Sequence, residues 1–137
     1  GYMHTTDDRT PVTFITRYYL DKIKRLCDAH GTKLLFVTAP SPVNHTMQRH
    51  NEVQALADAL AVPYLDLNLN TEELGIDWNL DTLDGGDHLN YTGCQKATAY
   101  LQRYMQTHYT LPDRRDDVRY EAWNKQAEEF EKLLPQP

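Results

Sequence analysis

The sequence has few cysteines, a single serine and no long apolar run. The two cysteines, Cys27 and Cys94, lack the paired spacing of a zinc site or a disulfide-rich scaffold. We expect both to be small buried apolar residues, and the sequence leaves open whether they form a disulfide. No apolar run approaches the roughly 20 residues that a membrane-spanning helix needs, so no membrane span is expected.

Basic residues are also scarce. The chain has 14 Lys and Arg against 20 Asp and Glu, which gives a formal net charge of -6. Such a chain has no basic surface to neutralise phosphates, so a nucleic acid or an anionic membrane is not expected as a partner. With 137 residues, 40% of them hydrophobic, it is long enough to bury a core, and we expect one domain over residues 1–137.

The first half of the chain alternates between helical and strand patterns. Residues 11–30 repeat apolar side chains at helical spacing and end at Gly31, where a helix C-cap belongs. Short apolar runs at 33–38 and 63–67 are typical of buried strands. Between them lies an amphipathic helix, whose apolar face carries Val53, Leu56, Ala57 and Leu60. This order predicts an α/β fold with a parallel sheet and crossover helices.

The second half begins with a long polar loop over residues 68–88, followed by a helix that starts near Thr92 and a terminal helix within 113–137. Two strands are too few for a stable open sheet, because such sheets usually have about four to six. Either the chain is the C-terminal part of a larger α/β domain, or a further short strand lies in the ends or in the long loop.

The stretch "LDGGDHLNYTG" concentrates titratable groups in one turn. His88 has two nearby carboxylates, Asp84 and Asp87. A carboxylate that fixes the tautomer of a histidine and stabilises its imidazolium is what a general base requires. The alternative is a helix entry, in which acidic groups complement the helix dipole and the glycines only make the turn.

The segment "DGGDHLNYTGCQKATAYLQRYM" resembles the last conserved block of the SGNH (GDSL-type) serine hydrolases, in which an Asp and a His stand in a turn before the final helix. "HLN" followed by a Gly resembles the cell-envelope branch of that family, whose members modify bacterial polysaccharides. The segments "LLFVTAPSPVNH" and "ALAVPYLDLN" resemble the late strands of the fold. The resemblance covers roughly residues 14–110 and implies a layered α/β/α, flavodoxin-like fold that is incomplete in this chain.

The resemblance implies an ester hydrolase that acts on acyl or acetyl esters, including esters on saccharides. His88 would be the base of a Ser-His-Asp triad. Its acid is open between Asp84 and Asp87, because the family spacing is Asp, two residues, His. We slightly favour Asp84, because the side chain of an adjacent residue such as Asp87 usually points elsewhere. This chemistry needs no cofactor, and the cell-envelope branch implies an extracytoplasmic location.

The sequence departs from the family by lacking the Gly-Asp-Ser block and the later Gly and Asn of the oxyanion hole. The resemblance therefore implies a partner that supplies the nucleophile, either a missing N-terminal half or a second copy. Ser41, the only serine, lies between two prolines, and Pro42 lacks the backbone N–H that a nucleophile elbow supplies to an oxyanion. We interpret Ser41 as part of a rigid loop.

Four residues near the strand ends and the His88 turn are candidates for substrate contacts: Ser41, Asn44, Trp78 and Asn90. The alternative for each is an ordinary loop or capping role. His45, His50 and Asp66 could be suggested as metal ligands, but their spacing matches no known pattern, so no metal site is predicted. A second functional hypothesis is a non-catalytic α/β module that binds a partner or a saccharide, because the nucleophile is absent.

Overall fold

The computed structural model describes residues 2–134. They divide into two compact units, and the boundary along the chain lies between Leu101 and Gln102. The first unit contains the strands and the first three α-helices, together with the start of α4 (Tyr91–His108). The second contains the rest of α4 and the terminal helix. The fold is α/β, as the alternating pattern predicts.

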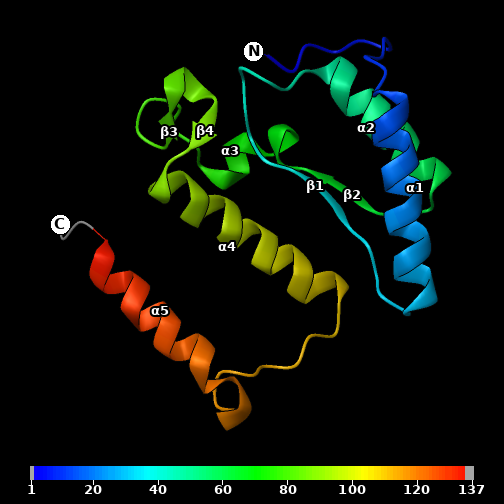
Figure 1. Ribbon diagram of the computed structural model, residues 1–137. Helices are drawn as coiled ribbons and strands as arrows, with labels where there is room; N and C mark the ends of the chain where they lie inside the picture. Colours follow the sequence, from blue (N-terminus) through cyan, green and yellow to red (C-terminus); the bar gives the residue numbers. More distant parts are fainter. Residues whose placement is uncertain (1, 135–137) are drawn as a thin grey trace. The chain divides into compact units, whose positions relative to one another are not determined.

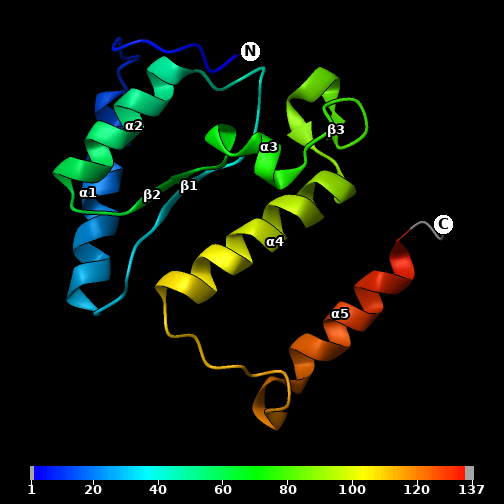
Figure 2. The same ribbon diagram turned by 180° about the vertical axis from the view of Figure 1, so that it is seen from behind.

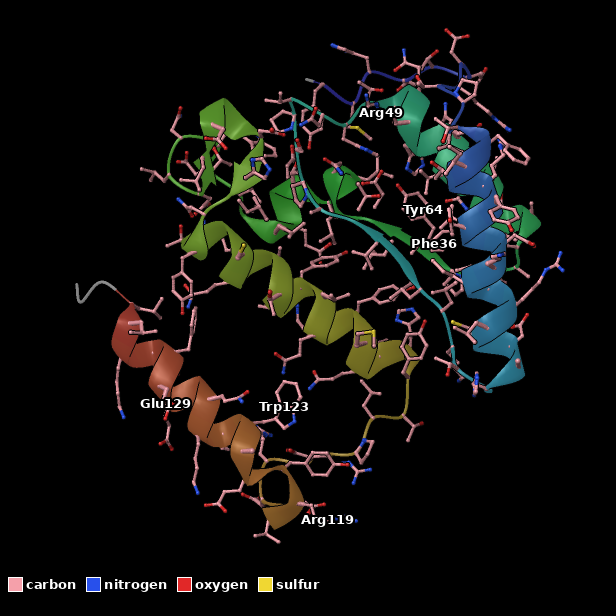
Figure 3. All side chains as sticks on the ribbon, in the orientation of Figure 1. Phe36, Arg49, Tyr64, Arg119, Trp123 and Glu129 are labelled. Atoms are coloured by element: carbon pink, nitrogen blue, oxygen red, sulfur yellow. The ribbon has the colours of Figure 1, made fainter. Side chains whose placement is uncertain are left out.

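Two short strands form the main sheet. β1 (Phe36–Thr38) pairs in parallel with β2 (Tyr64–Asp66), and Phe36 lies opposite Tyr64 (Figure 3). The prediction of parallel pairing between these two segments is confirmed. Each strand is shorter than its apolar run. Residues 33–35 form no ladder with β2, and Leu67 already belongs to the 3₁₀ turn that follows β2.

Helices α1 (Phe14–Ala29) and α2 (Met47–Ala59) lie side by side (Figures 1 and 2). Each begins at a threonine whose hydroxyl accepts a backbone N–H from the first turn, Thr13 for α1 and Thr46 for α2. The Arg17 guanidinium of α1 pairs with the buried Glu52 carboxylate of α2. This ion pair ties the two helices together.

The long loop after β2 contains short elements that its sequence pattern does not reveal. They are the 3₁₀ turn η1 (Leu67–Leu69), helix α3 (Thr71–Leu74), strand β3 (Thr82–Leu83), the 3₁₀ turn η2 (Asp84–Gly86) and strand β4 (His88–Leu89). β3 pairs antiparallel with β4 in a sheet separate from β1 and β2. A strand does lie in the long loop, but within the described residues it does not extend the parallel sheet.

The first turns of helix α4 are anchored to the segment directly before β3, which includes Asp81. The Asn90 side chain accepts the Gly93 N–H, and the Lys96 ammonium lies 2.5 Å from the Asp81 carboxylate. A Cβ added at Gly93 would lie 2.2 Å from the Asp81 carbonyl oxygen. Only glycine therefore allows this approach of the helix to that segment.

In the second unit, a 3₁₀ turn, η3 (Val118–Tyr120), leads into α5 (Glu121–Leu133). The helix is amphipathic, yet Trp123, Phe130 and Leu133 on its apolar side are all exposed. The apolar face of α5 thus has little cover within the described part of the chain.

The described core is small. Its buried apolar side chains come from α2, β2 and the segments beside them: Leu56, Ala57, Val62, Leu65, Leu67 and Leu74. None of the α1 residues is buried. The expectation that both cysteines are buried is wrong, because Cys27 is only half-buried on the uncovered α1 and Cys94 is exposed on α4. Both are free thiols. No helix within residues 2–134 is both long and apolar enough to cross a membrane.

Candidate functional site

The turn before α4 holds His88 in an unusual backbone. Asp84, Gly85 and Gly86 have φ of 51°, 66° and 104°, all in the left-handed region. Glycine adopts this region without steric cost, so only Asp84 is unusual here, and Asp tolerates the region better than most residues. A Cβ on Gly86 would lie 3.1 Å from Pro42 Cγ, so the turn packs against the loop that follows β1.

The His88 ring uses one nitrogen for a carboxylate. Nδ1 lies 3.0 Å from Asp84 Oδ2 and 3.6 Å from Asp87 Oδ2. Asp84 is therefore the hydrogen-bond partner, and the extra residue in the spacing does not prevent the pairing. Nε2 has no hydrogen-bond partner among residues 2–134, and 67% of the His88 side chain is exposed. The ring is thus oriented through Nδ1 and open at Nε2.

Asp87 is turned toward the loop after β1. Its Oδ1 accepts hydrogen bonds from the Ser41 hydroxyl at 3.2 Å and from the Asn44 amide. Since β1 ends at Thr38, the His88 turn lies beside the carboxyl end of that strand, where ligands bind in parallel sheets. The loop after β1 and the His88 turn, which the sequence places near the strand ends, therefore lie close together in the structure.

The remaining candidates make mostly structural contacts. Asn90 caps α4, and its amide donates to the Leu80 carbonyl at 2.6 Å. The Trp78 ring packs edge-on against Tyr2, with ring centroids 5.6 Å apart. Neither side chain forms a hydrogen bond or ring contact with His88 or Asp84. Asn90, and not Asp84 or Asp87, supplies the side-chain cap of α4 in the described structure, so the acidic groups are not explained by helix capping.

A second polar cluster lies at the carboxyl end of β2. The buried Asp66 Oδ2 accepts hydrogen bonds from His45 Nε2 and His50 Nδ1, both at 2.8 Å. Tyr64 OH lies 3.1 Å from the same oxygen, while Oδ1 accepts the backbone and side-chain N–H groups of Asn68. The cluster thereby connects β2 to the loop after β1 and to the first turns of α2.

The ionisation of this cluster follows from its contacts. Burial by itself would raise the pKa of Asp66, but hydrogen bonds from His45, Asn68 and His50 outweigh it and hold this pKa well below its usual value. Burial and the nearby Asp66 charge raise the pKa of Tyr2 to about 12. Tyr2 OH in turn donates to Asn68 Oδ1 at 3.0 Å. Asp66 is therefore a stable anion at neutral pH.

The structure brings together three residues for which the sequence predicted no site, His45, His50 and Asp66. Their nitrogens point at one carboxylate oxygen, and no group of three or more His, Cys, Asp or Glu side chains within residues 2–134 is arranged to hold a metal ion. The cluster is a hydrogen-bonded network. It could have been anticipated, because Asp66 and His45 follow neighbouring parallel strands whose carboxyl ends meet.

Comparisons with known proteins give no relative for this chain. No family model matches the sequence, no curated protein matches it, and no solved structure matches the fold.

Proposed function

We propose that this chain is part of an SGNH (GDSL-type) ester hydrolase and supplies the His and Asp of its triad. The observation that carries the proposal is the His88 ring, bound through Nδ1 to Asp84 at 3.0 Å with Nε2 unoccupied. The left-handed backbone of Asp84 and the place of the turn beside the carboxyl end of β1 support it. We also propose that the complete domain has a layered, flavodoxin-like fold.

In this mechanism, His88 Nε2 takes the proton of a serine hydroxyl supplied by polypeptide outside residues 1–137. The serine oxygen bonds to the ester carbonyl carbon, and the alcohol leaves with the proton that His88 returns. Water, deprotonated in the same way, then cleaves the acyl-enzyme. Asp84 keeps Nδ1–H in place and stabilises the imidazolium formed at each step. Substrates would be acyl or acetyl esters, with saccharide esters proposed from the family resemblance.

The test uses the gene product extended upstream, whose sequence should contain a Gly-Asp-Ser segment after a strand. His88→Ala should reduce hydrolysis of an aryl acetate by at least about a thousandfold, because triad members act as a unit. His30→Ala changes an exposed histidine at the end of α1 and serves as the matched control. Near-normal activity of His88→Ala in a folded enzyme would refute the proposal.

The 137-residue chain alone should show no serine-dependent esterase activity. Its only serine, Ser41, donates its hydroxyl to Asp87 and its backbone N–H to Asn68 Oδ1, so neither group is free for catalysis. An aryl acetate assay of the chain and of Ser41→Ala measures this. Turnover that disappears in Ser41→Ala would make Ser41 the nucleophile and overturn the need for a partner.

A further inference from the structure

A pocket of about 340 Å³ lies on the first unit, apart from the His88 turn. Its walls come from the N-terminal segment, the first turn of α1, the end of β1 and α2: Thr10, Pro11, Val12, Thr13, Thr16, Thr38, His45, Arg49 and Val53. The volume is in the range of about 300 to 1,000 Å³ that small-molecule sites occupy. None of its lining residues is acidic, although the whole chain has a net charge of -6.

Arg49 gives the pocket a positive charge without a counterion. Its Nη1 donates to the Asn44 carbonyl at 2.6 Å, which fixes the guanidinium at the first turn of α2 (Figure 3). Within residues 2–134, Arg49 forms no ion pair with a carboxylate. The buried carboxylates of α2 and β2 are already engaged, Glu52 by Arg17 and Asp66 by two imidazoles. The remaining guanidinium N–H groups are therefore available to an anion.

His45 adds a second polar group to the lining of the pocket. Its ring is 8% exposed, and Nε2 is held by Asp66. No buried side-chain nitrogen or oxygen in the described residues lacks a hydrogen-bond partner, and Nδ1 of His45 has none there. Nδ1 must therefore retain contact with solvent, and His45 is one of the residues that line the pocket. Because Nε2–H is donated to Asp66, Nδ1 of the neutral ring is a hydrogen-bond acceptor. The Asp66 contact fixes the orientation of the ring.

The other walls define the rest of the ligand. Pro11, Val12 and Val53 offer apolar surface, and Thr10 and Thr16 offer hydroxyl groups. One guanidinium beside a neutral apolar wall suits a single negative charge on a short aliphatic chain. We propose that this pocket binds a small organic carboxylate, with Arg49 pairing the carboxylate and the Thr10 hydroxyl donating a second hydrogen bond to it. The site is independent of the proposed esterase function.

The experiment follows backbone amide NMR signals of the chain during titration with sodium butanoate at constant ionic strength. Saturable shifts are expected at Thr10, Val12, Thr38, His45 and Arg49. Butanamide, which has the same size and no charge, should produce no saturable shifts. Inorganic phosphate is titrated in parallel to separate carboxylate recognition from a general anion site.

Two variants connect the binding to the pocket. Arg49→Gln should weaken butanoate binding by about tenfold or more, because a charge-assisted bond is lost. Arg25→Gln removes an arginine of α1 that is 78% exposed and pairs with Asp21, and it should change binding by less than about twofold. Val53→Phe, which fills the pocket, should abolish binding. This variant tests the site if Arg49→Gln does not fold.

Three outcomes would overturn the proposal. They are absent or unsaturable butanoate shifts, equal binding of butanoate and butanamide, and phosphate binding without butanoate binding. Because the readout is binding, a failure of the esterase proposal leaves this result unaffected, and the reverse also holds.

Discussion

At the scale of single residues, Asp66 shows how a buried charge is tolerated. Its carboxylate accepts hydrogen bonds from His45, His50, Tyr64 and Asn68, so the cost of leaving water is offset by direct contacts. Asn68 extends the network, since it also donates to the Ala39 carbonyl and accepts the Ser41 N–H. The loop that carries Ser41 and Asn44 is thereby held at the end of the sheet.

Replacing Asp66 should therefore weaken the fold. Asp66→Ala leaves two imidazoles and the Asn68 N–H groups without their acceptor, and we expect a loss on the order of 3 kcal/mol in the free energy of unfolding at pH 7. Urea denaturation measures the loss. Asp58→Asn, at an exposed carboxylate of α2, should change stability by less than about 0.5 kcal/mol. Equal stability of the Asp66→Ala variant and the parent chain would contradict the assigned role.

The stability should also depend on pH through Asp66. The pKa of this carboxyl is lower in the folded chain than in the unfolded chain, whose value is about 3.9. Its contribution is therefore fully present above about pH 5 and is lost as the pH falls through about 4 and below. Urea midpoints at pH 7, 5, 4 and 3 should fall less steeply for Asp66→Asn than for the parent chain. Parallel pH profiles for the two proteins would show that Asp66 is not the group responsible.

At the scale of elements, sequence patterns predicted the longer segments well. Helices α1, α2 and α4 and the parallel pairing of β1 with β2 follow from apolar periodicity. The sequence allowed a short strand in the long loop, but it did not locate the β3–β4 hairpin, because strands of two residues have no measurable period. Local pattern also gave no sign that Tyr2 would reach Asn68, since that contact spans 66 residues.

The candidate site was predictable to a similar degree. The turn sequence places His88 beside two carboxylates and slightly favours Asp84, because the side chain of an adjacent residue such as Asp87 usually points elsewhere. In the structure Ser41 and Asn44 compete with His88 for Asp87, and the ring bonds to Asp84. That competition is a tertiary contact, which the turn sequence does not contain. The prediction that Cys27 and Cys94 are buried was also wrong for lack of tertiary information. A helical pattern does not show whether the apolar face of the helix is covered.

The contact between α4 and the segment before β3 leads to a prediction for Gly93. Gly→Ala within a helix usually stabilises by about 1 kcal/mol. Here the added methyl group would overlap the Asp81 carbonyl, and we expect Gly93→Ala to destabilise the chain by about 1 to 3 kcal/mol. Thermal unfolding measures the effect. Ala99→Gly, at an exposed position of the same helix, should cost only about 1 kcal/mol. A gain in stability for Gly93→Ala would show that α4 does not pack this closely against the segment before β3.

At the scale of the whole molecule, much apolar surface has no cover in the described structure. On α1 it comprises Phe14, Ile15, Tyr18, Tyr19, Ile23 and Leu26, each at least 45% exposed. The sheet has only two described parallel strands, so it also leaves strand edges without a partner. Apolar patches of more than a few hundred Å² are unusual on monomers and mark surfaces that bind another chain. Such surface is therefore expected to bind another chain.

We therefore predict that the isolated chain associates reversibly through α1. Sedimentation should give an average mass that rises above 15.9 kDa with concentration, and an apolar fluorescent dye should bind. Ile23→Lys places a charge on the apolar face of α1 and should weaken association by about tenfold, since a lysine ammonium resists desolvation. Thr98→Lys adds the same charge at an exposed position of α4 and should leave the association unchanged. A chain that stays monomeric at every concentration and binds no dye would show that α1 needs no cover. If Thr98→Lys weakened association as much as Ile23→Lys, net charge and not the apolar face would control it.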